Sequence, residues 1–105
     1  MTTTLVKIEK NKGSHETVKG YRVNDHFVVT RCTYDKKCWT ITHVPSGLSA
    51  TPYTMGGPTS TMVEASIWGL ILSSYPTDWD NVKPTLPDRD TLRVLADRYH
   101  KVLGN

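Results

Sequence analysis

The sequence has few of the features that mark a secreted or membrane-bound chain. Its 105 residues include two cysteines and one phenylalanine, and the longest apolar run, residues 67–72, is far too short to span a bilayer. Residues 1–7 lack the apolar segment of a secretory signal. These absences predict a soluble, cytoplasmic protein with no membrane partner. Because disulfides are uncommon in reducing compartments, Cys32 and Cys38 are then expected to be free thiols.

The sequence also has only a small excess of basic over acidic residues. Thirteen Lys and Arg oppose ten Asp and Glu, which gives a net charge of +3. Residues 1–50 carry eight basic and four acidic side chains, hence +4, whereas residues 51–105 carry five and six, hence −1. The basic excess therefore belongs to the N-terminal half. A mild excess of this kind permits a phosphate-bearing partner without requiring one.

Neither an internal repeat nor a glycine-rich or serine-rich linker divides the chain. With 37% hydrophobic and 22% charged residues, the composition is that of a globular protein. A chain of this length has enough residues for one core and too few for two. We therefore expect a single domain over residues 1–105.

The first half of the chain has the pattern of a β-meander. Turn-forming residues recur at 24–25, 35–37 and 44–47 between segments rich in β-branched and aromatic residues. A further strand is expected at 5–10, followed by an exposed loop over 11–15. The pattern predicts a sheet over about residues 3–53 with three to five strands.

The register of the central hairpin depends on its loop. Apolar residues occupy odd positions in both of its strands, so odd residues must face odd residues across the pair. A loop over 34–36 places Cys32 opposite Cys38, whereas a loop over 35–37 places Tyr34 opposite Cys38. In either register the other sheet face is expected to be polar and exposed to solvent; its residues include Thr30, Thr40 and Thr42.

Two helices are predicted in the second half. Thr61 and Glu64 match a capping box, which starts a helix over about 62–74. Its expected apolar face consists of Val63, Ile67, Leu70 and Ile71. Three prolines prevent a helix over 75–87, and Asp88 is the expected N-cap of a second helix over about 89–103, ended by Gly104. The apolar stripe of that helix comprises Leu92, Leu95, Tyr99 and Val102.

Strands followed by helices define the expected fold class. It is α+β, an antiparallel β-meander followed by two helices packed on one sheet face. No cluster of histidines and cysteines has the spacing of a metal site, so no metal or cofactor is predicted. His43 with a nucleophile such as Ser46 is the best enzymatic candidate. We nevertheless predict a protein that is not an enzyme and assign no catalytic residue.

Two groups of residues are candidates for binding. In the proline-rich loop, Trp79 between two carboxylates is either a lid over the core or an exposed anchor, and the predicted protein-binding residues are Asp78, Trp79 and Asp80. Basic residues of the first half give an alternative role in binding DNA or RNA. These residues are Lys19, Arg22, Arg31, Lys36 and Lys37.

One hairpin sequence carries a resemblance. The stretch Trp39-Thr40-Ile41-Thr42-His43-Val44-Pro45-Ser46-Gly47 resembles small phage-encoded accessory proteins, in which such a hairpin precedes a single core helix. The resemblance covers residues 21–74, about half the chain. It implies a binding protein in the host cytoplasm that inhibits or redirects a host or defence protein. We expect a monomer or a homodimer. A small nucleic-acid-binding module is the alternative function.

Overall fold

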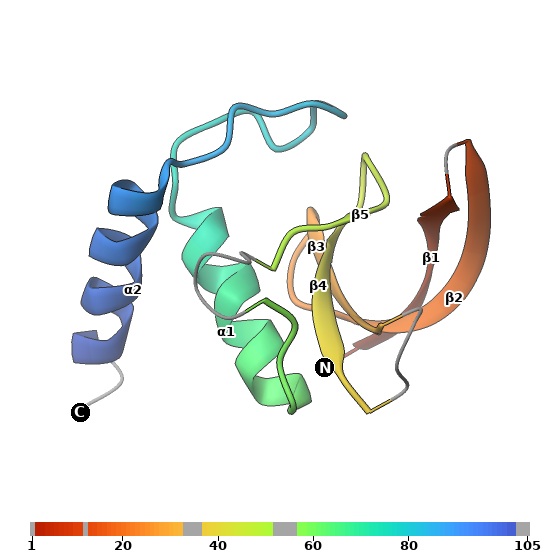
Figure 1. Cartoon of the computed structure of the whole chain (residues 1–105), viewed down its shortest axis with the longest axis horizontal. Coiled ribbons are helices and arrows are strands. Elements are labelled where there is room, and N and C mark those ends of the chain that lie inside the picture. The colour runs from red at the N-terminus through yellow and green to blue at the C-terminus, as the bar shows by residue number, and fades with distance from the viewer. Residues whose placement is uncertain (1, 12, 33–36, 52–56, 103–105) are drawn as a thin grey trace.

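Five strands follow one another along the first half of the chain, and each pairs with its neighbour in sequence. The computed structural model describes residues 2–11, 13–32, 37–51 and 57–102. The antiparallel sheet has the order β1-β2-β3-β4-β5, and two helices follow it (Figure 1). The predicted α+β meander is confirmed. The elements are β1 (Thr2–Asn11), β2 (Ser14–Arg22), β3 (Phe27–Arg31), β4 (Trp39–His43), β5 (Leu48–Ser49), α1 (Met62–Ser73) and α2 (Arg89–Val102).

The expected loop over 11–15 is wrong. β1 extends to Asn11 and β2 begins at Ser14, so a tight turn replaces the loop. Gly13 has φ 75°, a conformation that glycine adopts without steric cost. The two long strands form a strongly curved hairpin (Figure 1).

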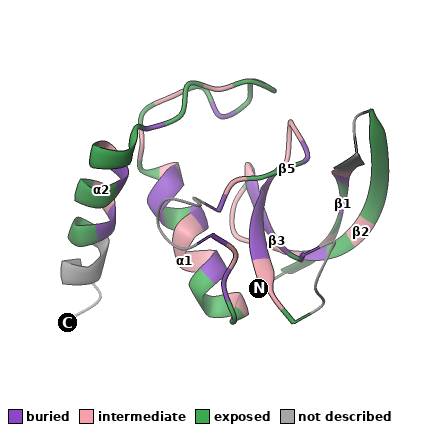
Figure 2. Cartoon of the chain, viewed as in Figure 1, coloured by how far each residue is buried: buried purple, intermediate pink, exposed green. Residues whose placement is uncertain are grey.

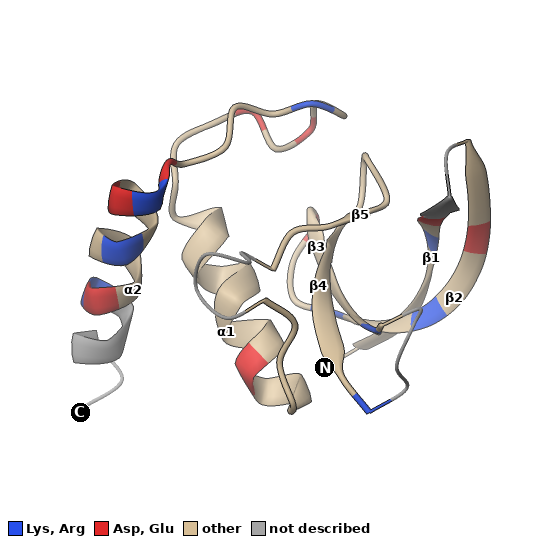
Figure 3. Cartoon of the chain, in the orientation of Figure 1, with Lys and Arg blue, Asp and Glu red and all other residues tan. Residues whose placement is uncertain are grey.

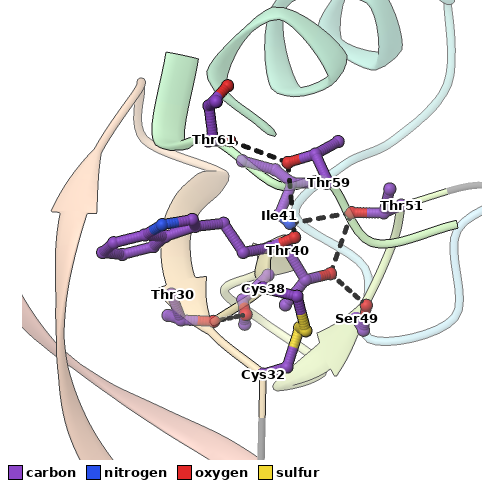
Figure 4. The surroundings of a disulfide bond; sticks show 11 residues. Thr30, Cys32, Cys38, Thr40, Ile41, Ser49, Thr51, Thr59 and Thr61 are labelled. Carbon is purple, nitrogen blue, oxygen red and sulfur yellow. Dashed lines mark hydrogen bonds between the residues drawn. A yellow bond between two sulfur atoms is a disulfide. The ribbon is translucent and has the colours of Figure 1, made fainter. Parts of the chain in front are cut away.

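The β3–β4 hairpin has the expected parity. Val29 lies opposite Ile41 and Arg31 opposite Trp39, as predicted for odd positions. Cys32 donates its backbone N–H to the Cys38 carbonyl, and the two Cα atoms are 5.6 Å apart. That separation suits a disulfide, and the two cysteines form one (Figure 4). The expectation of free thiols is therefore wrong, because it came from an assumed compartment rather than from the register.

The expectation of a solvent-facing second sheet face is also wrong. Thr30, Thr40 and Thr42 are buried there, because the β1–β2 hairpin bends over this face (Figures 1 and 2). Val6 and Ile8 of the hairpin form a small apolar cluster with Val28 of β3. The Glu9 N–H donates to the Gly47 carbonyl at 3.0 Å, which ties β1 to the β4–β5 turn. The sheet is thus bent into a partly closed barrel.

Hydroxyl groups on this buried face bond to one another. The Thr30 and Thr42 hydroxyls are 2.9 Å apart, and those of Thr40 and Thr51 are 2.8 Å apart (Figure 4). Thr40 also bonds to the Ser49 hydroxyl, while Thr51 accepts the Ile41 N–H at 2.9 Å. Because each hydroxyl has a partner, burial of these polar groups carries little penalty.

Helix α1 begins as predicted, and its expected apolar face is buried only in part. The Glu64 N–H donates to the Thr61 hydroxyl at 3.2 Å, which confirms the cap. Its buried residues are Ala65, Gly69, Ile71 and Leu72. Ile71 of the expected face is therefore buried, whereas Val63 and Leu70 are exposed. α1 packs on β3 and β4, and small residues allow a close approach. A helix that is apolar on all sides does not reveal from periodicity which face is buried.

Helix α2 packs against α1 on the side away from the sheet (Figure 1). The Thr91 N–H donates to the Asp88 carboxylate at 2.8 Å, which confirms the predicted N-cap and lowers the pKa of Asp88. Leu92 and Ala96 are buried, and Leu92 belongs to the same core as Phe27. Gly104 and the side chains of Tyr99 and Val102 lie outside the described residues.

Candidate functional site

Trp79 fixes the proline-rich loop to the core. We refer to residues 75–87 as the Trp79 loop; it leaves α1, extends toward the β4–β5 end of the sheet and returns to α2 (Figure 1). The Trp79 side chain is 6% exposed and packs edge-on against Phe27, with ring centroids 5.0 Å apart. Its indole N–H donates to the Tyr75 carbonyl at 3.2 Å. Of the two roles left open by the sequence, Trp79 therefore has that of the lid.

His43 holds the β4–β5 turn to this loop. Its Nε2 lies 2.7 Å from the Trp79 carbonyl oxygen, which can only accept, so Nε2 carries the hydrogen. In the neutral ring Nδ1 then accepts from the Ser46 hydroxyl at 2.8 Å. Ser46 in turn accepts the Leu48 N–H at 3.2 Å. Both imidazole nitrogens thus join the turn to the loop.

The two carboxylates beside Trp79 face solvent. Asp80 is 86% exposed and lies 2.7 Å from Nε2 of His26, in the segment between β2 and β3. Asp78 is exposed and accepts the Asp80 N–H at 3.1 Å. Of the predicted protein-binding residues, only the carboxylates of Asp78 and Asp80 are therefore accessible, while Trp79 supports them from below.

A cavity of about 370 Å³ lies between the Trp79 loop, the β4–β5 turn and the start of α2. Its lining is mainly apolar and includes Ala50, Leu72, Trp79 and Leu92. Three large apolar side chains around it are exposed to solvent: Leu48 (49%), Val82 (58%) and Leu86 (62%). Sequence reasoning missed this cavity. Its one local signal is the presence of Val82 and Leu86 among prolines and carboxylates.

The basic residues of the first half lie at separate positions on the sheet (Figure 3). Strand alternation and pairing place Lys19, Tyr21, Arg31 and Trp39 on the sheet face that α1 covers further along. Tyr21 and Trp39 are half-buried against the core at its edge, whereas Lys19 and Arg31 are exposed. The Arg31 guanidinium stacks 4.3 Å from the centroid of the Trp39 ring, and the Tyr21 and Trp39 rings are 6.2 Å apart. We call these four residues the basic aromatic face.

The remaining basic candidates differ in placement. Arg22 points its Nη1 toward the Asn24 carbonyl at 3.1 Å and thus braces the β2–β3 turn. Lys37 is exposed beside the disulfide, before β4. Lys36 lies outside the described residues. Of the predicted nucleic-acid-binding residues, the structure therefore places Lys19 and Arg31 in the basic aromatic face and Arg22 outside it.

No helix in the described part of the chain is both long and apolar enough to cross a membrane. The same residues contain no group of three or more His, Cys, Asp or Glu placed to hold a metal ion. Comparisons with protein-family models, with curated proteins and with solved structures found no match to this chain.

Proposed function

We propose that this chain is a non-enzymatic binding protein, a phage accessory protein that inhibits or redirects a host or defence protein. The resemblance of the Trp39–Gly47 hairpin supports the setting. The Trp79 loop supports the mode of action, because it presents exposed acidic and apolar side chains on an anchored backbone.

The anchoring of the loop is the observation that carries this proposal. Trp79 fills the core, its carbonyl bonds to His43, and Asp80 bonds to His26. Between and beyond these contacts, Asp78, Val82 and Leu86 are exposed. A loop that is already ordered loses little conformational entropy on binding. The partner is expected to offer an apolar contact with basic residues beside it.

Replacement of Leu86 should strongly weaken capture of this partner. Leu86→Asp places a charge in the apolar part of the surface and should reduce the amount of bound partner by about tenfold or more. The measurement is quantitative mass spectrometry of proteins retained from bacterial lysate by immobilised protein. Leu5→Asp is the matched control, since Leu5 is 72% exposed on β1. The proposal fails when wild type retains no specific protein, or when the Leu86 variant retains it equally well.

A second candidate function is binding of single-stranded DNA or RNA. The specific observation is the basic aromatic face, where Arg31 stacks on Trp39 beside Tyr21 and Lys19 follows on the same face. Aromatic rings stack on bases and neighbouring cations contact phosphates, a combination that binds single strands with little sequence preference.

Charge reversal on the sheet tests this candidate. Lys19→Glu with Arg31→Glu should weaken binding to a fluorescent oligonucleotide and reduce the salt slope by about 0.7 per lost phosphate contact. Fluorescence anisotropy over a salt series gives both quantities. Lys83→Glu, which changes the Trp79 loop instead, should leave them unaltered. Absence of binding by wild type at low ionic strength would rule out this function.

A further inference from the structure

The cavity beside the Trp79 loop has the size and lining of a small-molecule site. Its volume of about 370 Å³ falls within the usual range of such pockets, roughly 300–1,000 Å³. Leu72, Trp79 and Leu92 belong to the main core and give it a firm apolar lining. Val82 and Leu86 remain largely exposed, so a ligand that covered them would remove apolar surface from water.

The polar lining residues indicate which charge a ligand would carry. His43 and Ser46 bond to each other, and His43 also bonds to the Trp79 carbonyl, so these groups do not require a ligand. Within the part of the lining that the structure describes, Lys83 carries the one formal charge at neutral pH, with histidine taken as neutral. Among the described residues, none with an acidic side chain lines the cavity and none forms an ion pair with Lys83. The nearby Asp80 is directed to His26.

We propose that this cavity binds a small amphipathic carboxylate. Its apolar body would pack on Leu72, Trp79 and Leu92, and its carboxylate would pair with the Lys83 ammonium. Val82 and Leu86 would cover the apolar body from the solvent side. This inference goes beyond the proposed function and does not require a protein partner.

Binding of purified protein to a series of linear carboxylates tests the inference. Isothermal titration with hexanoate, octanoate and decanoate below their aggregation concentrations should show affinity rising by about fourfold for each added methylene. Octylammonium, which has the opposite charge, should bind more weakly than octanoate. Failure of octanoate to bind wild type, or equal binding of octylammonium, would overturn the proposal.

Two exposed substitutions locate the ligand. Lys83→Glu should weaken octanoate binding by about fivefold or more. Lys37→Glu, in the segment between β3 and β4, is the control and should leave octanoate binding unchanged. Val82→Asp should also weaken it, with Val63→Asp on α1 as the matched control at similar exposure. Unchanged melting temperatures of these variants would show that each remains folded. Octanoate binding that is unaffected by both Lys83→Glu and Val82→Asp would place the ligand elsewhere and overturn the assignment.

Both proposals can fail separately. The titrations contain only protein and ligand, so their outcome does not depend on whether a host protein is found. Conversely, the capture experiment with the Leu86 variant does not require a carboxylate ligand in the cavity. Octanoate binding in the absence of a captured partner would support the cavity and leave the proposed function rejected.

Discussion

Trp79→Ala should destabilise the protein by about 3–5 kcal/mol, as expected for truncation of a large buried aromatic side chain. Trp79 contacts Phe27 at 5.0 Å and His43 at 5.8 Å between ring centroids, and it closes the side of the core. Its removal leaves a cavity that the proline-rich loop cannot easily fill. In a chain of 105 residues this loss should lower the melting temperature by more than about 10 °C.

A conservative variant separates packing from hydrogen bonding at this position. Trp79→Phe keeps an aromatic ring against Phe27 and loses the N–H that donates to the Tyr75 carbonyl. It should therefore cost less than the alanine variant, about 1–2 kcal/mol. Urea unfolding measures both changes. If Trp79→Ala cost no more than an average surface substitution, within about 0.5 kcal/mol, Trp79 would not be the lid.

Local signals in the sequence were sufficient to locate several elements. Thr61 and Asp88 begin the two helices because their side chains accept backbone N–H groups, a property that depends on three or four neighbouring residues. The meander order likewise follows from turn chemistry, as at Gly47, where φ is 71°. Short-range physics of this kind is visible in a sequence.

Features that depend on curvature or on distant segments were not predictable. Thr30 and Thr42 have the polarity of an exposed face, yet a bend of the β1–β2 hairpin buries them and pairs their hydroxyls. Prediction of the Cys32–Cys38 disulfide would have required both the register of the β3–β4 hairpin and the redox state of the compartment.

The candidate site was predictable only in part. The loop that contains Asp78, Trp79 and Asp80 was recognised from its composition. Its anchoring by His43 joins residues 36 positions apart in sequence, and the cavity combines the β4–β5 turn, α1, the loop and α2. Proximity of this kind depends on packing between elements, which no local pattern encodes.

Gly20→Ala should destabilise the sheet by about 2–3 kcal/mol, at the upper end of the range for overpacking. Gly20 lies within β2, just before the residues that pair with β3. A Cβ there would be 2.4 Å from Val28 Cγ1 and 2.7 Å from the Val29 carbonyl oxygen. Val28 is fully buried and the carbonyl belongs to the backbone, so the strands would have to separate. Glycine is therefore required where the curved hairpin meets β3.

Two comparisons identify the clash as the cause. Gly13→Ala meets no atom within 4 Å and pays only for its positive φ, about 1 kcal/mol. In a Val28→Ala background the 2.4 Å contact is absent, so the additional cost of Gly20→Ala should become smaller, while the contact with the Val29 carbonyl keeps it above zero. Urea unfolding of the four proteins in this cycle measures the coupling. An equal cost of Gly20→Ala in both backgrounds would show that contact with Val28 does not require glycine at this position.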